Sequence, residues 1–107
     1  MTTHDILYRL SETLATRRHA DPETSYTAKL LANGPDSILK KIGEESAELI
    51  IAAKDGKRLN IVWESTDLIY HILVLLTYYG MGSEEGAQEM RRREGVSGID
   101  EKKSRIK

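Results

Sequence analysis

Apolar residues recur every three or four positions along most of this chain, the spacing that gathers side chains on one face of an α-helix. The alternation of apolar and polar residues that marks a half-buried strand is rare, and the sequence has no phenylalanine. We therefore predict an all-α fold, an antiparallel helical bundle of about five helices.

The first two predicted helices are bounded by residues that end or cap helices. The first, over the N-terminal residues, should end before Pro22, because proline disfavours helical geometry in the residue that precedes it. The second is expected to begin at an N-cap of Thr24 or Ser25 and to close at residues 33–34, an Asn-Gly pair.

Three longer segments complete the predicted bundle. A third helix is expected over residues 36–54 and a fourth from an N-cap at Asn60 to residue 79. Ser83, followed by two glutamates, should cap a fifth helix that ends near residue 92. We expect residues 95–107 to form an irregular or mobile tail.

Length and composition narrow the classes of function. At 107 residues the chain has room for a single domain with a core of its own. The net charge of -1 supplies no basic field for nucleic acid. With no cysteine there can be no disulfide, no thiolate metal site and no cysteine nucleophile, so any metal would need oxygen or imidazole ligands.

The chain shows no clear targeting or membrane signal. Its longest apolar run, LIYHILVLL, is about half of what a membrane span needs, and it contains a histidine. The N-terminal residues lack the basic start and long apolar stretch of a signal peptide. We expect a cytoplasmic protein with neither a membrane nor a nucleic acid as partner.

The third predicted helix carries acidic residues where an apolar stripe is expected. At 100° per residue, Glu45 falls in the middle of the apolar face, Glu48 lies at its edge one turn later, and Glu44 lies further around. That face is formed by Ile38, Ile42, Leu49, Ala52 and Ala53. An unpaired carboxylate in a buried stripe costs several kcal/mol, so a solvated surface glutamate is a poor interpretation of Glu45, although it stays open for Glu44.

The fourth predicted helix repeats this arrangement with Glu64 and Asp67, which are also three positions apart and lie opposite its apolar side. His71 falls on the same stripe as these acids. Two helices joined by a short turn should lie antiparallel, so each would offer a pair of carboxylates to the other. Four such acids would repel one another unless cations share the space.

Magnesium fits this expected group of carboxylates, because it is a hard ion that takes oxygen ligands and completes its coordination with water and phosphate. Lysines at positions 29, 40, 41 and 54 flank the acids. Acids that hold a metal beside cations that hold phosphate indicate a site for a polyphosphate ester. For any single lysine, a solvated basic face is an equally good interpretation.

The motif EESAE, followed after fifteen residues by ESTD, resembles the E-E-x-x-E … E-x-x-D signature of the all-α NTP pyrophosphatase (MazG-like) superfamily. Four further stretches resemble phosphoribosyl-ATP pyrophosphatases of histidine biosynthesis: SYTAKLLANG, KKIGEESAELIIAAK, DLIYHILVLL and SGIDEKKSR. The resemblance extends over nearly the whole chain from Leu7 onward.

This resemblance implies an enzyme that binds ATP-like nucleotides. The expected reaction is the Mg²⁺-dependent hydrolysis of phosphoribosyl-ATP to phosphoribosyl-AMP and pyrophosphate, the second step of histidine biosynthesis, in a helical homodimer. The chain is too short for the cyclohydrolase domain to which many relatives are fused, and it lacks the cysteines of such a zinc enzyme.

Site residues follow from the resemblance position by position. It implies that Glu45, Glu48, Glu64 and Asp67 are the metal ligands, the same four acids that helix geometry selects. Glu44 belongs to the catalytic motif, and its role is open between binding a second metal and accepting a proton from water. The family pattern also suggests Lys41 and Lys54 as phosphate contacts. His71, which its position on the carboxylate stripe selects, is expected to contact the substrate or a metal ligand, while metal ligation or packing remain alternatives.

Two other functions remain as alternatives. The first keeps the metal site but takes ordinary or damaged (deoxy)nucleoside triphosphates, as housekeeping members of the superfamily do. The second is a non-catalytic helical interaction module, whose acids would be only a solvated stripe. Dimerisation has its own support, because the fourth helix is apolar around most of its circumference. The alternative is a central helix that is wrapped fully within one chain.

Overall fold

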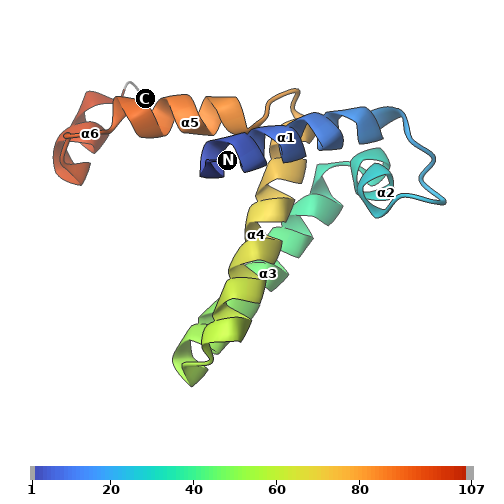
Figure 1. The fold of residues 1–107 in the computed structure, drawn as a ribbon, viewed down its shortest axis with the longest axis horizontal. Coiled ribbons are helices and arrows are strands. Elements are labelled where there is room, and N and C mark those ends of the chain that lie inside the picture. Colours follow the sequence, from blue (N-terminus) through green and yellow to red (C-terminus); the bar gives the residue numbers. More distant parts are fainter. Residues whose placement is uncertain (1, 106–107) are drawn as a thin grey trace.

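The computed structural model describes residues 2–105, and every regular element in that range is helical, which confirms the all-α prediction. Within these residues, six α-helices and one short 3₁₀ helix follow one another (Figure 1). They are α1 (Thr3–Thr16), η1 (Arg17–His19), α2 (Tyr26–Asn33), α3 (Pro35–Asp55), α4 (Arg58–Tyr78), α5 (Ser83–Arg92) and α6 (Gly98–Ser104).

The two longest helices, α3 and α4, form an antiparallel pair that projects from the other helices (Figure 1). Gly56 reverses the chain between them in a left-handed conformation (φ 70°), which glycine adopts without steric cost. Pro35 starts α3, where its fixed φ suits the first turn and its missing N–H is not needed. This pair carries every predicted metal ligand.

The apolar core lies where the base of this pair meets α1 and α2. Ile38 of α3 and Val74 of α4 are fully buried there. The other buried members of the cluster are Leu14, Leu30 and Leu73. Burying side chains of this size stabilises a fold by about 1.5–3 kcal/mol each, so the core anchors one end of the α3–α4 pair and leaves the other end projecting.

Helix ends agree with the predictions in part. Ser25 caps α2, since its hydroxyl accepts a hydrogen bond from the N–H of Ala28 at 3.1 Å. The predicted N-cap at Asn60 is wrong: α4 begins at Arg58, because Gly56 completes the reversal early and leaves Lys57 as the extended residue before the helix. Ser83 does not cap α5 either, since it is the first helical residue and its N–H donates to Ser11 Oγ at 2.9 Å.

The prediction of an irregular tail is wrong for Gly98–Ser104, which forms α6. Ser97 caps this helix by accepting a hydrogen bond from the N–H of Asp100. Glu101 is buried and accepts hydrogen bonds from Arg92 of α5 and from Arg105. The predicted tail failed because local capping and these charge-assisted hydrogen bonds hold the segment, although it contributes little apolar surface. Residues 106–107 lie outside the described range.

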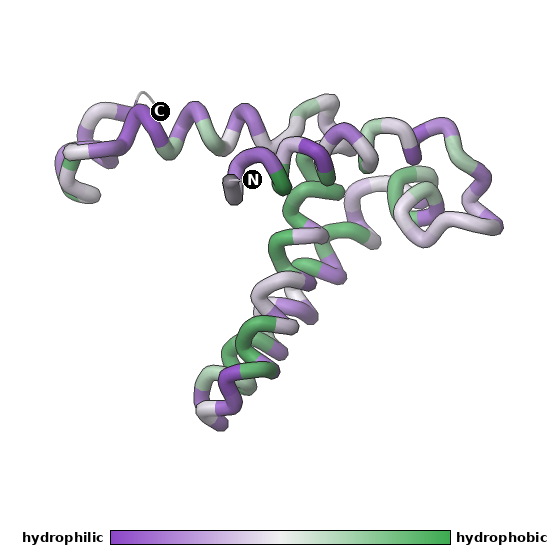
Figure 2. Tube along the Cα trace, in the orientation of Figure 1, coloured by the Kyte–Doolittle hydropathy of each residue, from purple (hydrophilic) through white to green (hydrophobic). Residues whose placement is uncertain are grey.

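The outer faces of α3 and α4 expose an unusual amount of apolar surface. Figure 2 shows apolar stretches along the projecting pair, whereas α5 and α6 are mostly hydrophilic. Trp63 is 55% exposed. The other large exposed apolar side chains on the two helices are Leu39, Ile50, Ile51, Leu59, Val62, Ile69 and Ile72. We call these eight residues the apolar arm surface. A central helix wrapped within one chain is therefore wrong for the described residues.

Candidate metal and phosphate site

Glu45 lies inside the packed α3–α4 pair rather than on its surface. The residue is 8% exposed, on the same face of α3 as fully buried Ile38. Burial raises the pKa of the Glu45 carboxyl, and the nearby charges of Asp67 and Glu48 act in the same direction, while His71 opposes them. The sequence pattern predicted an acidic residue within the apolar face of this helix, and the position of Glu45 confirms that prediction.

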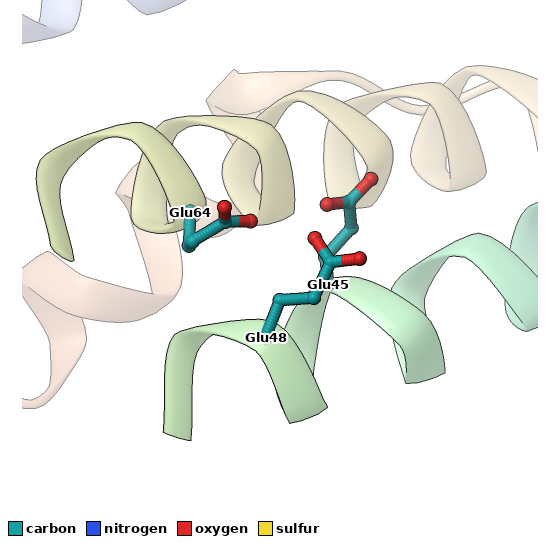
Figure 3. A group of neighbouring side chains, drawn as sticks. All are labelled: Glu45, Glu48 and Glu64. Atoms are coloured by element: carbon teal, nitrogen blue, oxygen red, sulfur yellow. The ribbon is translucent and has the colours of Figure 1, made fainter. Parts of the chain in front are cut away.

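Three carboxylates from two helices meet at this point (Figure 3). Glu45 and Glu48 come from α3 and Glu64 from α4, and each offers one oxygen atom within 4.8 Å of the others. We call these three residues the carboxylate group. The i, i+3 spacing in α3 turns two side chains toward the same place, and the antiparallel pairing brings the third across from α4.

One carboxyl oxygen of Glu64 lacks a hydrogen-bond partner. Its Oε2 atom is buried and has no hydrogen-bond partner, a condition that is costly for a polar atom and needs a cause. Hydrogen bonding to Glu48 is the largest influence that raises the pKa of the Glu64 carboxyl, followed by burial and by the charge of Glu48.

The carboxylate group fits a hard divalent cation. All three members offer oxygen ligands at mutual distances that one ion can span. A cation would also supply the partner that Glu64 Oε2 lacks. Glu48 is exposed, so one side of the group is open to solvent and to a substrate.

Asp67 and Glu44 lie at the margin of this group. Asp67 is exposed and is not among the three clustered carboxylates, although its charge raises the pKa of both Glu45 and Glu64. Glu44 is exposed as well, and its Oε2 atom lies 3.5 Å from Nζ of Lys41. The structure thus gathers three of the four predicted ligands directly and places the fourth nearby.

The predicted phosphate contacts differ in their surroundings. Lys41 lies close to the acids, and its pKa is raised, first by Tyr26 and then by Glu44. Lys54 is exposed near the end of α3. Lys41 is therefore the cation that the structure associates with the candidate site.

His71 is buried beside the carboxylate group, and both of its ring nitrogens face protein atoms. Nδ1 lies 2.9 Å from the backbone oxygen of Asp67 and 3.3 Å from Oε1 of Glu45. Nε2 lies 2.9 Å from the hydroxyl oxygen of Tyr26. Sequence reasoning missed Tyr26, because its contact with His71 spans 45 positions and no periodicity in the sequence marks it.

An all-helical fold with acids from two antiparallel helices is the arrangement expected of the all-α NTP pyrophosphatases of the MazG-like superfamily. The comparisons with known proteins narrow this class. The family model for phosphoribosyl-ATP pyrophosphohydrolase matches residues 7–94, which is most of the chain. The chain belongs to this family.

Several relatives carry the name phosphoribosyl-ATP pyrophosphatase. The protein of Dechloromonas aromatica is 80% identical over 98% of this chain and 97% of its own length. That of Aromatoleum aromaticum is 56% identical over 94% of each chain. The protein of Nitrosospira multiformis is 53% identical over 98% of this chain and 87% of its own length.

Proposed function

We propose that this chain hydrolyses phosphoribosyl-ATP to phosphoribosyl-AMP and pyrophosphate, the second step of histidine biosynthesis, with Mg²⁺ as its cofactor. The observation that carries the proposal is the carboxylate group with the unpartnered Oε2 of Glu64, in a chain of the phosphoribosyl-ATP pyrophosphohydrolase family.

Each acid has a distinct part in the proposed reaction. Glu45, Glu48 and Glu64 would hold Mg²⁺, with Asp67 completing the set from the margin. When bound, the metal supplies positive charge that stabilises the phosphoryl oxygens and the pyrophosphate leaving group. Glu44, which is exposed, would bind a second metal or accept a proton from the attacking water.

The lysines would contribute charge and orientation to the substrate. Lys41 sits beside the acids and offers a cation to the phosphates, and Lys54 would do the same from the last turn of α3. Little covalent chemistry falls to the protein in phosphoryl transfer, so positioning and electrostatic stabilisation should account for most of the rate.

The proposed enzyme is a homodimer in which a second copy covers the apolar arm surface. Its eight exposed apolar side chains lie on two adjacent helices, and apolar surface exposed in this amount marks interaction sites. By length and composition alone α4 could cross a membrane, but each acid carried into the bilayer centre would cost about 3 kcal/mol. A second copy covers the surface without that cost, and the absence of cysteine suits a cytoplasmic location.

The deciding experiment measures pyrophosphate release from phosphoribosyl-ATP beside ATP, dCTP and dUTP, first with Mg²⁺ and then with a chelator. The proposal requires a strong preference for phosphoribosyl-ATP that disappears with the chelator. Activity on the ordinary triphosphates alone would keep the metal site and replace the substrate. Hydrolysis of none of them would contradict both.

A further inference from the structure

His71 lies beside the carboxylate group and contacts residues of α2 and α3, but it is not one of the three clustered acids. The residue is 6% exposed and belongs to α4, while Glu45 belongs to α3 and Tyr26 to the first turn of α2. Its ring lies edge-on to Tyr26, with centroids 6.0 Å apart, and edge-on to Tyr70, with centroids 5.4 Å apart. The imidazole is therefore enclosed on several sides and has little freedom to rotate.

The hydrogen-bond partners determine which ring nitrogen carries the proton. Nδ1 faces the backbone oxygen of Asp67 and a carboxylate oxygen of Glu45, and both of these atoms accept hydrogen bonds. Nδ1 must therefore carry the hydrogen. In the neutral ring Nε2 is then an acceptor, and the Tyr26 hydroxyl donates to it at 2.9 Å.

The Tyr26 hydroxyl is suited to the role of donor. Burial is the largest influence on its pKa and raises it, with Glu45 adding to the rise and Lys41 opposing it. The hydroxyl therefore keeps its proton at neutral pH. The hydrogen bonds thus run in one direction, from Tyr26 to His71 and from His71 to the backbone oxygen of Asp67. Oε1 of Glu45 lies 3.3 Å from the same Nδ1 atom.

We propose that Tyr26 and His71 are positioning residues, which fix the Glu45 carboxylate at the place where it binds the metal. This inference rests on the proposed function, because it assigns a purpose to Glu45 as a ligand. In metal sites generally, neighbouring residues contact the ligands and hold them in place. Removing such a neighbour weakens metal binding by about 10–100-fold. It also gives His71 a role other than direct contact with substrate, since both ring nitrogens are engaged.

A pair of substitutions separates this role from packing. In His71→Asn the side-chain amide nitrogen lies near the former Nδ1 and still presents an N–H to the Glu45 carboxylate, whereas in His71→Gln it lies near the former Nε2. Glutamine fills more of the buried volume than asparagine does. A packing role therefore predicts that the glutamine variant is closer to wild type, and a positioning role predicts that the asparagine variant is.

The variants Tyr26→Phe and Tyr70→Phe form a matched pair that tests the hydrogen bond between Tyr26 and His71. Each change removes one hydroxyl from a ring that lies edge-on to His71. The Tyr70 hydroxyl is hydrogen-bonded to Thr27 Oγ1 and not to the imidazole, so its loss leaves the hydrogen bonds of His71 intact. Only Tyr26→Phe should weaken Mg²⁺ binding, at the lower end of the range, by about tenfold.

The experiment measures the Mg²⁺ concentration that gives half-maximal thermal stabilisation of each purified full-length variant, without substrate. His71→Gln should need about 10–100-fold more Mg²⁺ than wild type, with His71→Asn between them. Imidazole ¹⁵N NMR spectra of the metal-free wild type should show the Nδ1–H tautomer of His71. The Nε2–H tautomer, a glutamine variant that binds as well as asparagine, or equal effects of the two tyrosine changes would each overturn the proposal.

The response of the wild-type protein to Mg²⁺ tests the proposed function separately from the positioning role. A wild-type protein that Mg²⁺ does not stabilise would contradict the metal site itself. A wild type that responds to Mg²⁺, beside variants that respond equally, would contradict only the positioning role.

Discussion

Glu48 of α3 and Glu64 of α4 direct carboxyl oxygens to within 4.8 Å of each other across the helix pair. This proximity raises the pKa of Glu64, through a hydrogen bond to Glu48 and through the charge of Glu48. When both groups are ionised, the metal-free protein holds its helix pair together against repulsion between carboxylates. A divalent cation would convert that repulsion into attraction, so stability and metal binding should be linked.

Glu48→Gln should separate these two effects. The variant should retain the helical fold and melt a few degrees higher than wild type in chelator, because one repulsive charge is gone. Pyrophosphate release should fall by more than about 100-fold. Removing a residue that only contacts a metal ligand already lowers metal affinity or activity by about 10–100-fold, and Glu48 is proposed as a ligand itself. Circular dichroism melts with and without Mg²⁺, together with a pyrophosphate assay, test both expectations.

Glu12→Gln is the matched control for this change, because Glu12 is an exposed carboxylate of α1 outside the carboxylate group. It should leave the melting temperature in chelator, the response to Mg²⁺ and the activity unchanged. Wild-type turnover in Glu48→Gln would remove Glu48 from the set of ligands. A melting temperature lower than that of wild type in chelator would show that repulsion does not dominate there.

The stability of the metal-free protein should depend on pH through Glu45 and Glu64, whose pKa values are both raised above 4.5. The folded state then holds protons to higher pH than the unfolded state, so the stabilisation is complete below about pH 4.5 and is lost as pH rises through the raised pKa values. The melting temperature of Glu64→Gln minus that of wild type, in chelator, should therefore increase as pH rises from 4.5. A difference that stays constant over this range would contradict the raised pKa of Glu64.

The sequence predicted the carboxylate group well because the relevant interactions are local or nearly so. The i, i+3 spacing within α3 and the short turn at Gly56 between α3 and α4 determine which acids converge. A buried glutamate in an apolar stripe is visible from periodicity alone. The family motif selects the same residues, so geometry and resemblance agree on Glu45, Glu48 and Glu64.

The contacts that sequence reasoning missed are long-range or depend on several weak local preferences. Tyr26 reaches His71 only because the core folds α2 against α4, and nothing in the sequence near either residue marks that contact. α6 was missed because its apolar content is low and its stability comes from Glu101 with arginines on both sides in sequence. The start of α4 was misplaced because the turn at Gly56 is tighter than the Asn60 signal suggested.

Dimerisation through the apolar arm surface predicts a concentration-dependent environment for Trp63, the sole tryptophan, which is 55% exposed in one chain. Its fluorescence emission should shift to shorter wavelength as protein concentration rises, in parallel with a dimer mass in sedimentation. Val62→Asp should abolish both changes, because a charge would be buried at the interface.

Tyr8→Asp is the control for this variant, since it places the same charge on an exposed aromatic residue of α1 outside the apolar arm surface. It should leave the dimer intact. A monomeric wild type at all accessible concentrations, with emission typical of a solvated indole, would contradict the proposal that a second copy covers this surface.

Glu101 should hold α6 against α5 above about pH 4.5 and release it in acid. Hydrogen bonds from Arg105 are the largest influence on its carboxyl and, with those from Arg92, lower its pKa to about 2. Because the folded-state pKa lies below the usual 4.5, this stabilisation is present above pH 4.5 and is lost as pH falls toward 2.

Glu101→Gln should produce the same release at neutral pH, with amide exchange in α6 accelerated by about tenfold or more while the α3–α4 pair stays protected. Glu94→Gln, at an exposed position between the two helices, should leave that exchange unchanged, and an unaltered α6 in the Glu101 variant would show that capping by Ser97 suffices to hold it.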